Sequence, residues 1–96
     1  MKIVGRERLA AFCDKHADAR QWTEHWLSEV EAARWATSQD IRARYASASF
    51  LAGNVVIFNV KGNRYRLELR VAYATAVVVV IWIGTHADYE GRNRER

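Results

Sequence analysis

The sequence contains no proline, a single cysteine and three histidines, and each scarcity excludes a class of protein. The lone Cys13 cannot form an internal disulfide, and its apolar neighbours favour a packed core thiol over a reactive one. One cysteine and three scattered histidines do not match the ligand spacing of a zinc site. The sequence also lacks a phosphate-binding glycine loop, a dinucleotide fingerprint and a nucleophile elbow. We therefore expect neither a metal nor a cofactor.

Long apolar segments are also missing. The longest run, 76–83, is far too short to cross a bilayer. Residues 1–7 become charged too early for a signal peptide. We expect a cytoplasmic protein without a membrane role, folded as one domain over residues 1–96.

Positive charge exceeds negative charge, with 15 Lys and Arg against 11 Asp and Glu, a net charge of +4. A small basic domain suggests a polyanionic partner. The total alone is a weak signal, because many basic domains bind no nucleic acid. The placement of the cations along the chain must decide.

The first half of the chain is predicted to be helical, because its apolar residues recur every three or four positions. Asp18 is expected to cap the second helix, and Thr37 or Ser38 the third. Trp22 and Trp26 follow the apolar stripe of the second helix, which favours core positions over base-stacking platforms. The predicted helices cover 6–15, 18–35 and 39–45, after a short strand at 2–4.

The second half changes to the period of β-strands. Strands are predicted at 54–60, 64–73 and 77–83, with a tight turn at 61–63 in which Gly62 and Asn63 accept positive φ. The last strand is apolar throughout, which indicates a position inside the sheet. We therefore predict an α+β fold with the N-terminal helices packed on one face of a twisted antiparallel sheet.

Cations gather on the strand at 64–73. Lys61, Arg64, Arg66 and Arg70 form a cluster with only Glu68 among them, and the period of two puts the three arginines on one face. Guanidinium groups bind phosphate through paired donors, so this face is a candidate phosphate-binding surface. The alternative is a solubilising face that protects the sheet from edge aggregation.

Proton-transfer groups follow the last strand. If the segment is helical, His86 and Tyr89 share one face at i and i+3, next to Glu90. A purely structural histidine is the alternative. The basic tail at 92–96 is either a phosphate-binding extension or a frayed end.

Three segments resemble the HigB-type toxins of type II toxin–antitoxin systems, in the RelE/ParE-like superfamily. Residues 58–67 (FNVKGNRYRL) resemble the F-N-x-K-G-N-x-Y-R-L core of those toxins, and residues 83–89 (IGTHADY) resemble their I-G-T-H-x-x-Y ending. Residues 45–50 (YASASF) resemble a Y-P-S-A-S-F segment, with Ala46 where proline is common. Glu90 stands where the family often has Asp, and Ile81 where it often has a basic residue.

The resemblance implies a RelE-like fold and a metal-independent endoribonuclease that cleaves mRNA at the ribosome, an mRNA interferase. It also implies a HigA-like antitoxin with a helix-turn-helix domain. Acidic residues of that antitoxin would complement the cations, either over the arginine-rich face or beside the helices. The expected catalytic residues are His86, Tyr89, Arg66 and Arg70, and the expected RNA-phosphate ligands are Lys61, Asn63 and Arg64.

In the expected reaction the 2′-OH of RNA attacks the adjacent phosphorus in line. Arg66, Arg70 and Lys61 would stabilise the charge on the phosphoryl oxygens. His86 or Tyr89 would transfer protons, and the sequence does not assign acid and base between them. Two other functions stay open, because fold alone does not choose between them: a gyrase poison of the same fold, or a degenerate regulator that only binds its antitoxin.

Overall fold

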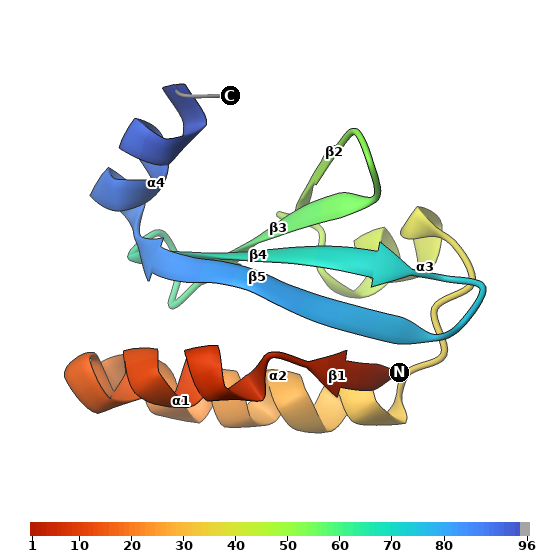
Figure 1. Cartoon of the computed structure of the whole chain (residues 1–96), viewed down its shortest axis with the longest axis horizontal. Helices are drawn as coiled ribbons and strands as arrows, with labels where there is room; N and C mark the ends of the chain where they lie inside the picture. The colour runs from red at the N-terminus through yellow and green to blue at the C-terminus, as the bar shows by residue number, and fades with distance from the viewer. Residues whose placement is uncertain (95–96) are drawn as a thin grey trace.

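The chain forms an α+β fold around a five-stranded sheet, as a computed structural model of residues 1–94 shows (Figure 1). Helices α1 and α2 lie side by side against one face of the sheet. Helix α4 stands on the opposite side, where β5 ends (Figure 1). The elements are, in chain order, β1 (Lys2–Val4), α1 (Arg6–Lys15), the 3-10 helix η1 (Ala17–Ala19), α2 (Arg20–Ala32), α3 (Ser38–Arg44), β2 (Ser49–Leu51), β3 (Val55–Val60), β4 (Tyr65–Ala72), β5 (Val77–Thr85) and α4 (His86–Arg94).

The predicted fold class, the first strand and the first helix are confirmed. The cap predicted at Asp18 is wrong: α2 begins at Arg20 after η1, and it ends at Ala32. The third helix begins at Ser38, and the carboxylate of Asp40 accepts the backbone N–H groups of Ala36 and Thr37 at 2.8 and 3.2 Å. Thr37, one of the two predicted caps, is the N-cap residue, and its side chain in turn accepts the backbone N–H of Asp40, so the two residues form a capping box.

The sheet has the strand order β1-β5-β4-β3-β2. The prediction that β5 lies inside the sheet is confirmed, since β1 and β4 flank it. The predicted all-antiparallel pairing is wrong at one edge, where β1 runs parallel to β5. Strand β2, at the other edge of the sheet, was not predicted from the sequence.

The connection between β3 and β4 also differs in detail from its prediction. Lys61 and Gly62 adopt positive φ, at 53° and 67°, whereas Asn63 does not. Glycine takes this conformation at no steric cost, and Lys61 takes it as a rare non-glycine residue. Asn63 therefore has a negative φ, and its side chain makes the contact with Arg66 described below.

The hydrophobic core lies between the sheet and the helices α1, α2 and α3. Trp26 is buried there, with its ring centroid 5.8 Å from that of Phe58, and the ring centroid of Tyr45 lies 4.9 Å from that of Phe58. Leu67 and Leu69 of β4 are fully buried in the same cluster. The predicted core face of β4 is therefore confirmed, and burial of these large side chains is the main stabilising contribution.

The N-terminal ammonium group of Met1 lies at the C-terminal end of α2. It donates hydrogen bonds to the carbonyl oxygens of Val30 at 3.0 Å, Glu31 at 3.3 Å and Ala33 at 2.6 Å. These carbonyls lie at the helix C-terminus, where intrahelical donors run out and a positive charge is favoured. The contact fixes β1 beside α2.

Candidate functional site

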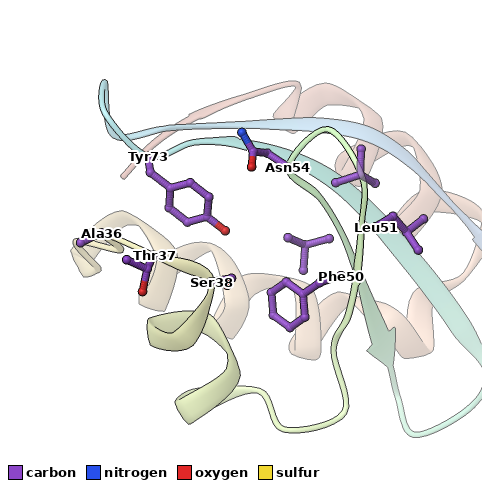
Figure 2. Close-up of a pocket in the computed structure, with 9 residues that line it drawn as sticks. Ala36, Thr37, Ser38, Phe50, Leu51, Asn54 and Tyr73 are labelled. Atoms are coloured by element: carbon purple, nitrogen blue, oxygen red, sulfur yellow. The ribbon is translucent and has the colours of Figure 1, made fainter.

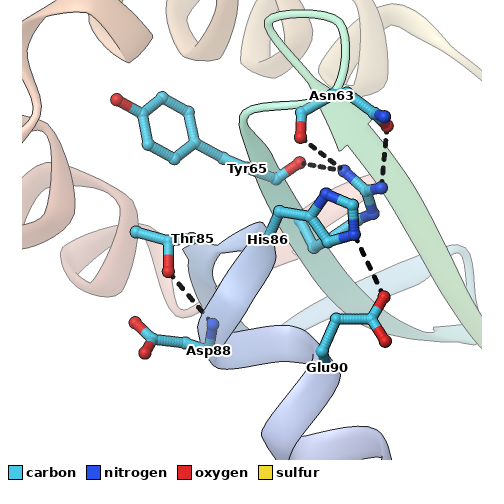
Figure 3. Close-up of polar contacts among 7 residues, drawn as sticks. Asn63, Tyr65, Thr85, His86, Asp88 and Glu90 are labelled. Carbon is cyan, nitrogen blue, oxygen red and sulfur yellow. Dashed lines mark hydrogen bonds and ion pairs between the residues drawn. The ribbon is translucent and has the colours of Figure 1, made fainter.

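The two sequence motifs meet at one end of the sheet, where the 61–64 turn lies against the start of α4. In the β4–β5 pair, Arg66 lies opposite Gly84, and the next residues toward that end, Tyr65 and Thr85, are also paired. The backbone N–H of His86 then donates to the carbonyl oxygen of Arg64 at 2.9 Å. Strand register thus places the first residue of α4 beside the basic turn (Figure 3).

Arg66 is held by the turn itself. Its Nη1 donates to the carbonyl oxygens of Tyr65 at 3.1 Å and Asn63 at 3.3 Å, and its Nη2 donates to Asn63 Oδ1 at 2.8 Å (Figure 3). The residue is only 9% exposed. All three acceptors are uncharged, so the positive charge of the guanidinium is not cancelled by a direct carboxylate contact. Partial removal from water strengthens its effect on nearby charges.

The predicted arginine face is not a continuous cationic surface. Glu68, between Arg66 and Arg70 on the outer face of β4, is 3% exposed, and its carboxylate accepts two hydrogen bonds from Arg92 at 3.2 and 3.4 Å. Only Arg66 and Arg70 share this face, opposite Asn59 and Val55 of β3. The prediction that Arg64 belongs to it is wrong.

Arg64 lies in the turn and reaches toward the helix layer instead. Its Nη1 donates to Asp18 Oδ2 at 2.8 Å, and the hydroxyl of Tyr65 donates to Asp18 Oδ1 at 2.6 Å. The Tyr65 hydrogen bond, followed by the Arg64 contacts, lowers the pKa of Asp18 below its ordinary value, although burial opposes the shift. The same hydrogen bond raises the pKa of Tyr65. Asp18 therefore ties η1 to the turn.

Lys61, Arg64 and Arg70 are the exposed cations of the predicted set, and Arg64 is paired with Asp18. Lys61 lies at the tip of the turn, close in sequence to Asn63 and Arg66. Arg70 lies four residues along β4 from Arg66, a separation of about 13 Å at the usual rise of a strand. Neither side chain has a hydrogen bond or ion pair within residues 1–94, so both can meet an external anion.

His86 is oriented by a neighbour on its own helix. Its Nε2 lies 3.0 Å from Glu90 Oε1, one turn further along α4 (Figure 3). A carboxylate can only accept, so this contact places a proton on Nε2 and leaves Nδ1 of the neutral ring as an acceptor. Thr85 Oγ1 accepts the backbone N–H of Asp88 at 3.1 Å, which fixes the first turn of the helix. The segment is helical, which is the condition under which the sequence placed His86 and Tyr89 on one face.

Tyr89 follows His86 at i+3 in α4, as the predicted helix requires. Its ring centroid lies 6.3 Å from that of Trp82 on β5. The side chain is half-buried. Tyr89 therefore contacts the outer face of the sheet, while His86 lies at the turn.

One cavity in the described part of the chain lies away from these residues. It has a volume of about 370 Å³ and is enclosed by α3, β2 and β3, with Tyr73 at its side (Figure 2). Burial raises the pKa of the Tyr73 hydroxyl. No predicted site residue lines this cavity. Within residues 1–94, His, Cys, Asp and Glu side chains form no cluster that could hold a metal ion, and no helix is long and apolar enough to span a membrane.

A family model agrees with the motifs that this geometry brings together. The model of the HigB toxin family, the RelE-like toxic component of a toxin–antitoxin system, matches residues 19–91. The chain belongs to this family. The matched segment includes the turn, β4, β5 and most of α4, and leaves out β1 and α1. No individual curated protein matches this HigB-family chain.

Three contacts at the HigB-family site were missed from the sequence. The i,i+4 spacing of His86 and Glu90 is the pattern of a helical pair and could have revealed their contact. The Asp18 contact with Arg64 and Tyr65 joins residues far apart in the chain, so no local pattern shows it. Arg92 was assigned to the tail, but it belongs to α4 and binds Glu68, which excludes both tail alternatives for this residue. Residues 95–96 of that tail lie outside the described part of the chain.

Proposed function

We propose that this HigB-family toxin is a metal-independent endoribonuclease that cleaves mRNA on the ribosome in the cytoplasm. The observation that supports this most is the His86–Glu90 pair at the head of α4, beside the turn that holds Arg66. A carboxylate-oriented imidazole is a proton-transfer group, and an adjacent desolvated cation stabilises negative charge. These are the two needs of RNA cleavage by its own 2′-oxygen.

The proposed reaction begins when Nδ1 of His86 accepts the proton of the ribose 2′-OH. The 2′-oxygen then forms a bond to the adjacent phosphorus, and the bond from phosphorus to the 5′-oxygen breaks. The charge of Arg66 stabilises the phosphoryl oxygens as they gain negative charge. The leaving 5′-oxygen takes a proton from the hydroxyl of Tyr89. The products are a 2′,3′-cyclic phosphate and a 5′-hydroxyl end.

The remaining predicted residues divide into two groups in this proposal. Exposed Lys61 and Arg70 contact RNA phosphates on either side of the reacting one, at the turn and along β4. Asn63 and Arg64 instead shape the site, because Asn63 holds Arg66 and Arg64 is paired with Asp18. A toxin of this family has an antitoxin partner, and we propose a HigA-like protein whose acidic residues cover Lys61 and Arg70.

The test is cleavage of a defined mRNA by the purified protein, with and without translating ribosomes, followed by mapping of the product ends. We expect internal cuts that leave 5′-hydroxyl ends. His86→Gln is expected to lower the single-turnover rate about 10²–10⁴-fold. His25→Gln is the matched control, since His25 lies exposed on α2, and it should keep the wild-type rate.

A folded His86→Gln protein with the wild-type rate would remove His86 from the mechanism. Expression in growing cells separates the other functions. DNA breaks without new RNA ends would replace the nuclease with a gyrase poison. Expression without growth arrest would favour a regulator that only binds its antitoxin.

A further inference from the structure

Helix α4 is poorly equipped to stay folded and docked by itself. It has nine residues, none of them is buried, and Gly91 interrupts its second half. Isolated helices of this length are unstable in water, so tertiary contacts must hold it. Its first residue is His86, so whatever docks α4 also fixes the imidazole relative to the turn.

The docking surface for α4 is created by an irregularity in β5. Leu69 pairs with Val80 and Glu68 with Trp82, so Ile81 is an extra residue in the ladder. This bulge reverses the alternation of core-facing and outward-facing side chains along β5, and so places Trp82 on the outer face beside Glu68. A Cβ atom on Gly84 would lie 2.4 Å from the Trp82 ring, so glycine at this position leaves room for the indole.

Arg92 joins α4 to this surface through two contacts. Its Nε and Nη2 donate to the two carboxylate oxygens of Glu68 at 3.2 and 3.4 Å. Its guanidinium carbon lies 5.2 Å from the centroid of the Trp82 ring, in cation–π geometry. The forked contact with a nearly buried carboxylate fixes direction as well as distance. Tyr89 adds its ring contact on the same indole.

We propose that Arg92 is a positioning residue, which uses Glu68 and Trp82 to hold α4 in the orientation that places His86 at the 61–66 turn. This role rests on the proposed nuclease function. Arg92 does not take part in proton transfer. It lies six residues beyond His86 on α4, and its side chain is paired with Glu68 of β4. Its loss lets α4 detach, so the imidazole no longer stays beside Arg66. Binding of RNA through Lys61 and Arg70 is retained.

The test compares Arg92→Ala and Arg92→Lys with Arg94→Ala in the full chain. Arg94 is the matched control, because it lies on the same helix, carries the same charge, is exposed and has no hydrogen bond or ion pair within residues 1–94. Cleavage is measured under single-turnover conditions with the mRNA and ribosomes described above. Binding is measured with the same RNA carrying a 2′-deoxy sugar at the cut, which cannot react.

For Arg92→Ala we expect a cleavage rate at saturation at least about 10-fold lower, with affinity for the deoxy RNA changed less than about threefold. Arg92→Lys keeps the charge without the fork and should lie between Arg92→Ala and the wild type. Arg94→Ala should keep the wild-type rate. Unchanged cleavage by Arg92→Ala, or an equal loss in Arg94→Ala, would overturn the proposal.

Amide hydrogen exchange gives a readout that does not depend on activity. The N–H of His86, which donates to Arg64, should exchange at least about 10-fold faster in Arg92→Ala than in the wild type or in Arg94→Ala, while core amides of β4 keep their protection. Unchanged protection of α4 would overturn the positioning role. If the wild-type protein cleaves no RNA, the nuclease proposal fails, and hydrogen exchange still decides whether Arg92 docks the helix.

Discussion

The two faces of strand β4 differ in what they do. The face toward the helices carries Leu67, Leu69 and Val71, all buried in the core. The outer face carries Arg66 and Glu68, which are also nearly buried but are charged and held by directional hydrogen bonds. One strand thus combines a face that stabilises the fold with a face that positions the site.

The difference shows that burial alone does not distinguish core from site. Apolar burial is non-directional and tolerates small shifts of neighbouring groups. The outer face instead depends on geometry, because Arg66 needs Asn63 in place and Glu68 needs Arg92. Changes on the core face should therefore appear mainly in unfolding free energy, and changes on the outer face mainly in the site.

The largest effect on stability is expected from the core face. Phe58→Ala removes a buried ring that contacts Trp26 and Tyr45, and should lower the unfolding free energy by about 3–5 kcal/mol. The neighbouring Asn59→Ala, on the outer face, should cost less than about 1 kcal/mol. Urea denaturation measures both. Equal losses would contradict the division of the sheet into two faces.

A smaller loss of unfolding free energy is expected from a change at the junction of β5 and α4. Gly84→Ala forces the Trp82 ring away from its position and should lower the unfolding free energy by about 1–3 kcal/mol. It should also lower RNA cleavage, because Trp82 contacts Arg92. Gly91→Ala has no atom within 4 Å of the new Cβ and should stabilise α4 by about 0.5–1 kcal/mol. Thermal denaturation that ranks the two variants in the reverse order would refute this.

A pH-dependent effect is expected from the contact between η1 and the turn. The folded protein lowers the pKa of Asp18 below its ordinary value of 3.8, mainly through the Tyr65 hydrogen bond. The ionised form is thus favoured by folding, so its stabilisation is present above pH 3.8 and is lost as the pH falls through the folded pKa. The difference in stability between wild type and Asp18→Asn should shrink on acidification from pH 7. A constant difference would show that Asp18 is not the titrating group.

The smallest effect on stability is expected at Arg70, which is exposed and has no ion pair within residues 1–94. Arg70→Ala should change the unfolding free energy by no more than about 0.5 kcal/mol. If Arg70 contacts a phosphate, the substitution should reduce the slope of log binding constant against log salt concentration by about one unit. Titration of the deoxy RNA at several salt concentrations measures this, and an unchanged slope would exclude the contact.

The predictions from sequence succeeded where a pattern repeats over many residues. The helix at 6–15 and the strands predicted at 54–60, 64–73 and 77–83 follow from regular periods, and the structure places helices and strands there. Prediction failed where one long-range contact overrides the local preference. Asp18 looks like a helix cap but binds Tyr65 and Arg64, and Arg92 looks like a tail residue but binds Glu68.

The sequence by itself determined the family, the α+β class and the apolar side of β4. The family follows from short motifs, and the other two follow from the spacing of apolar residues along the chain. Only the tertiary structure decided which charged side chains are paired within the fold and which remain exposed to an external ligand. The bulge at Ile81, the register that sets Arg66 opposite Gly84 and the docking of α4 each depend on strands meeting across space. The physical reason is that the partners of a charged side chain are often residues distant in the sequence. A charged side chain that is paired in the fold stabilises the protein, whereas an unpaired and exposed one can bind a ligand.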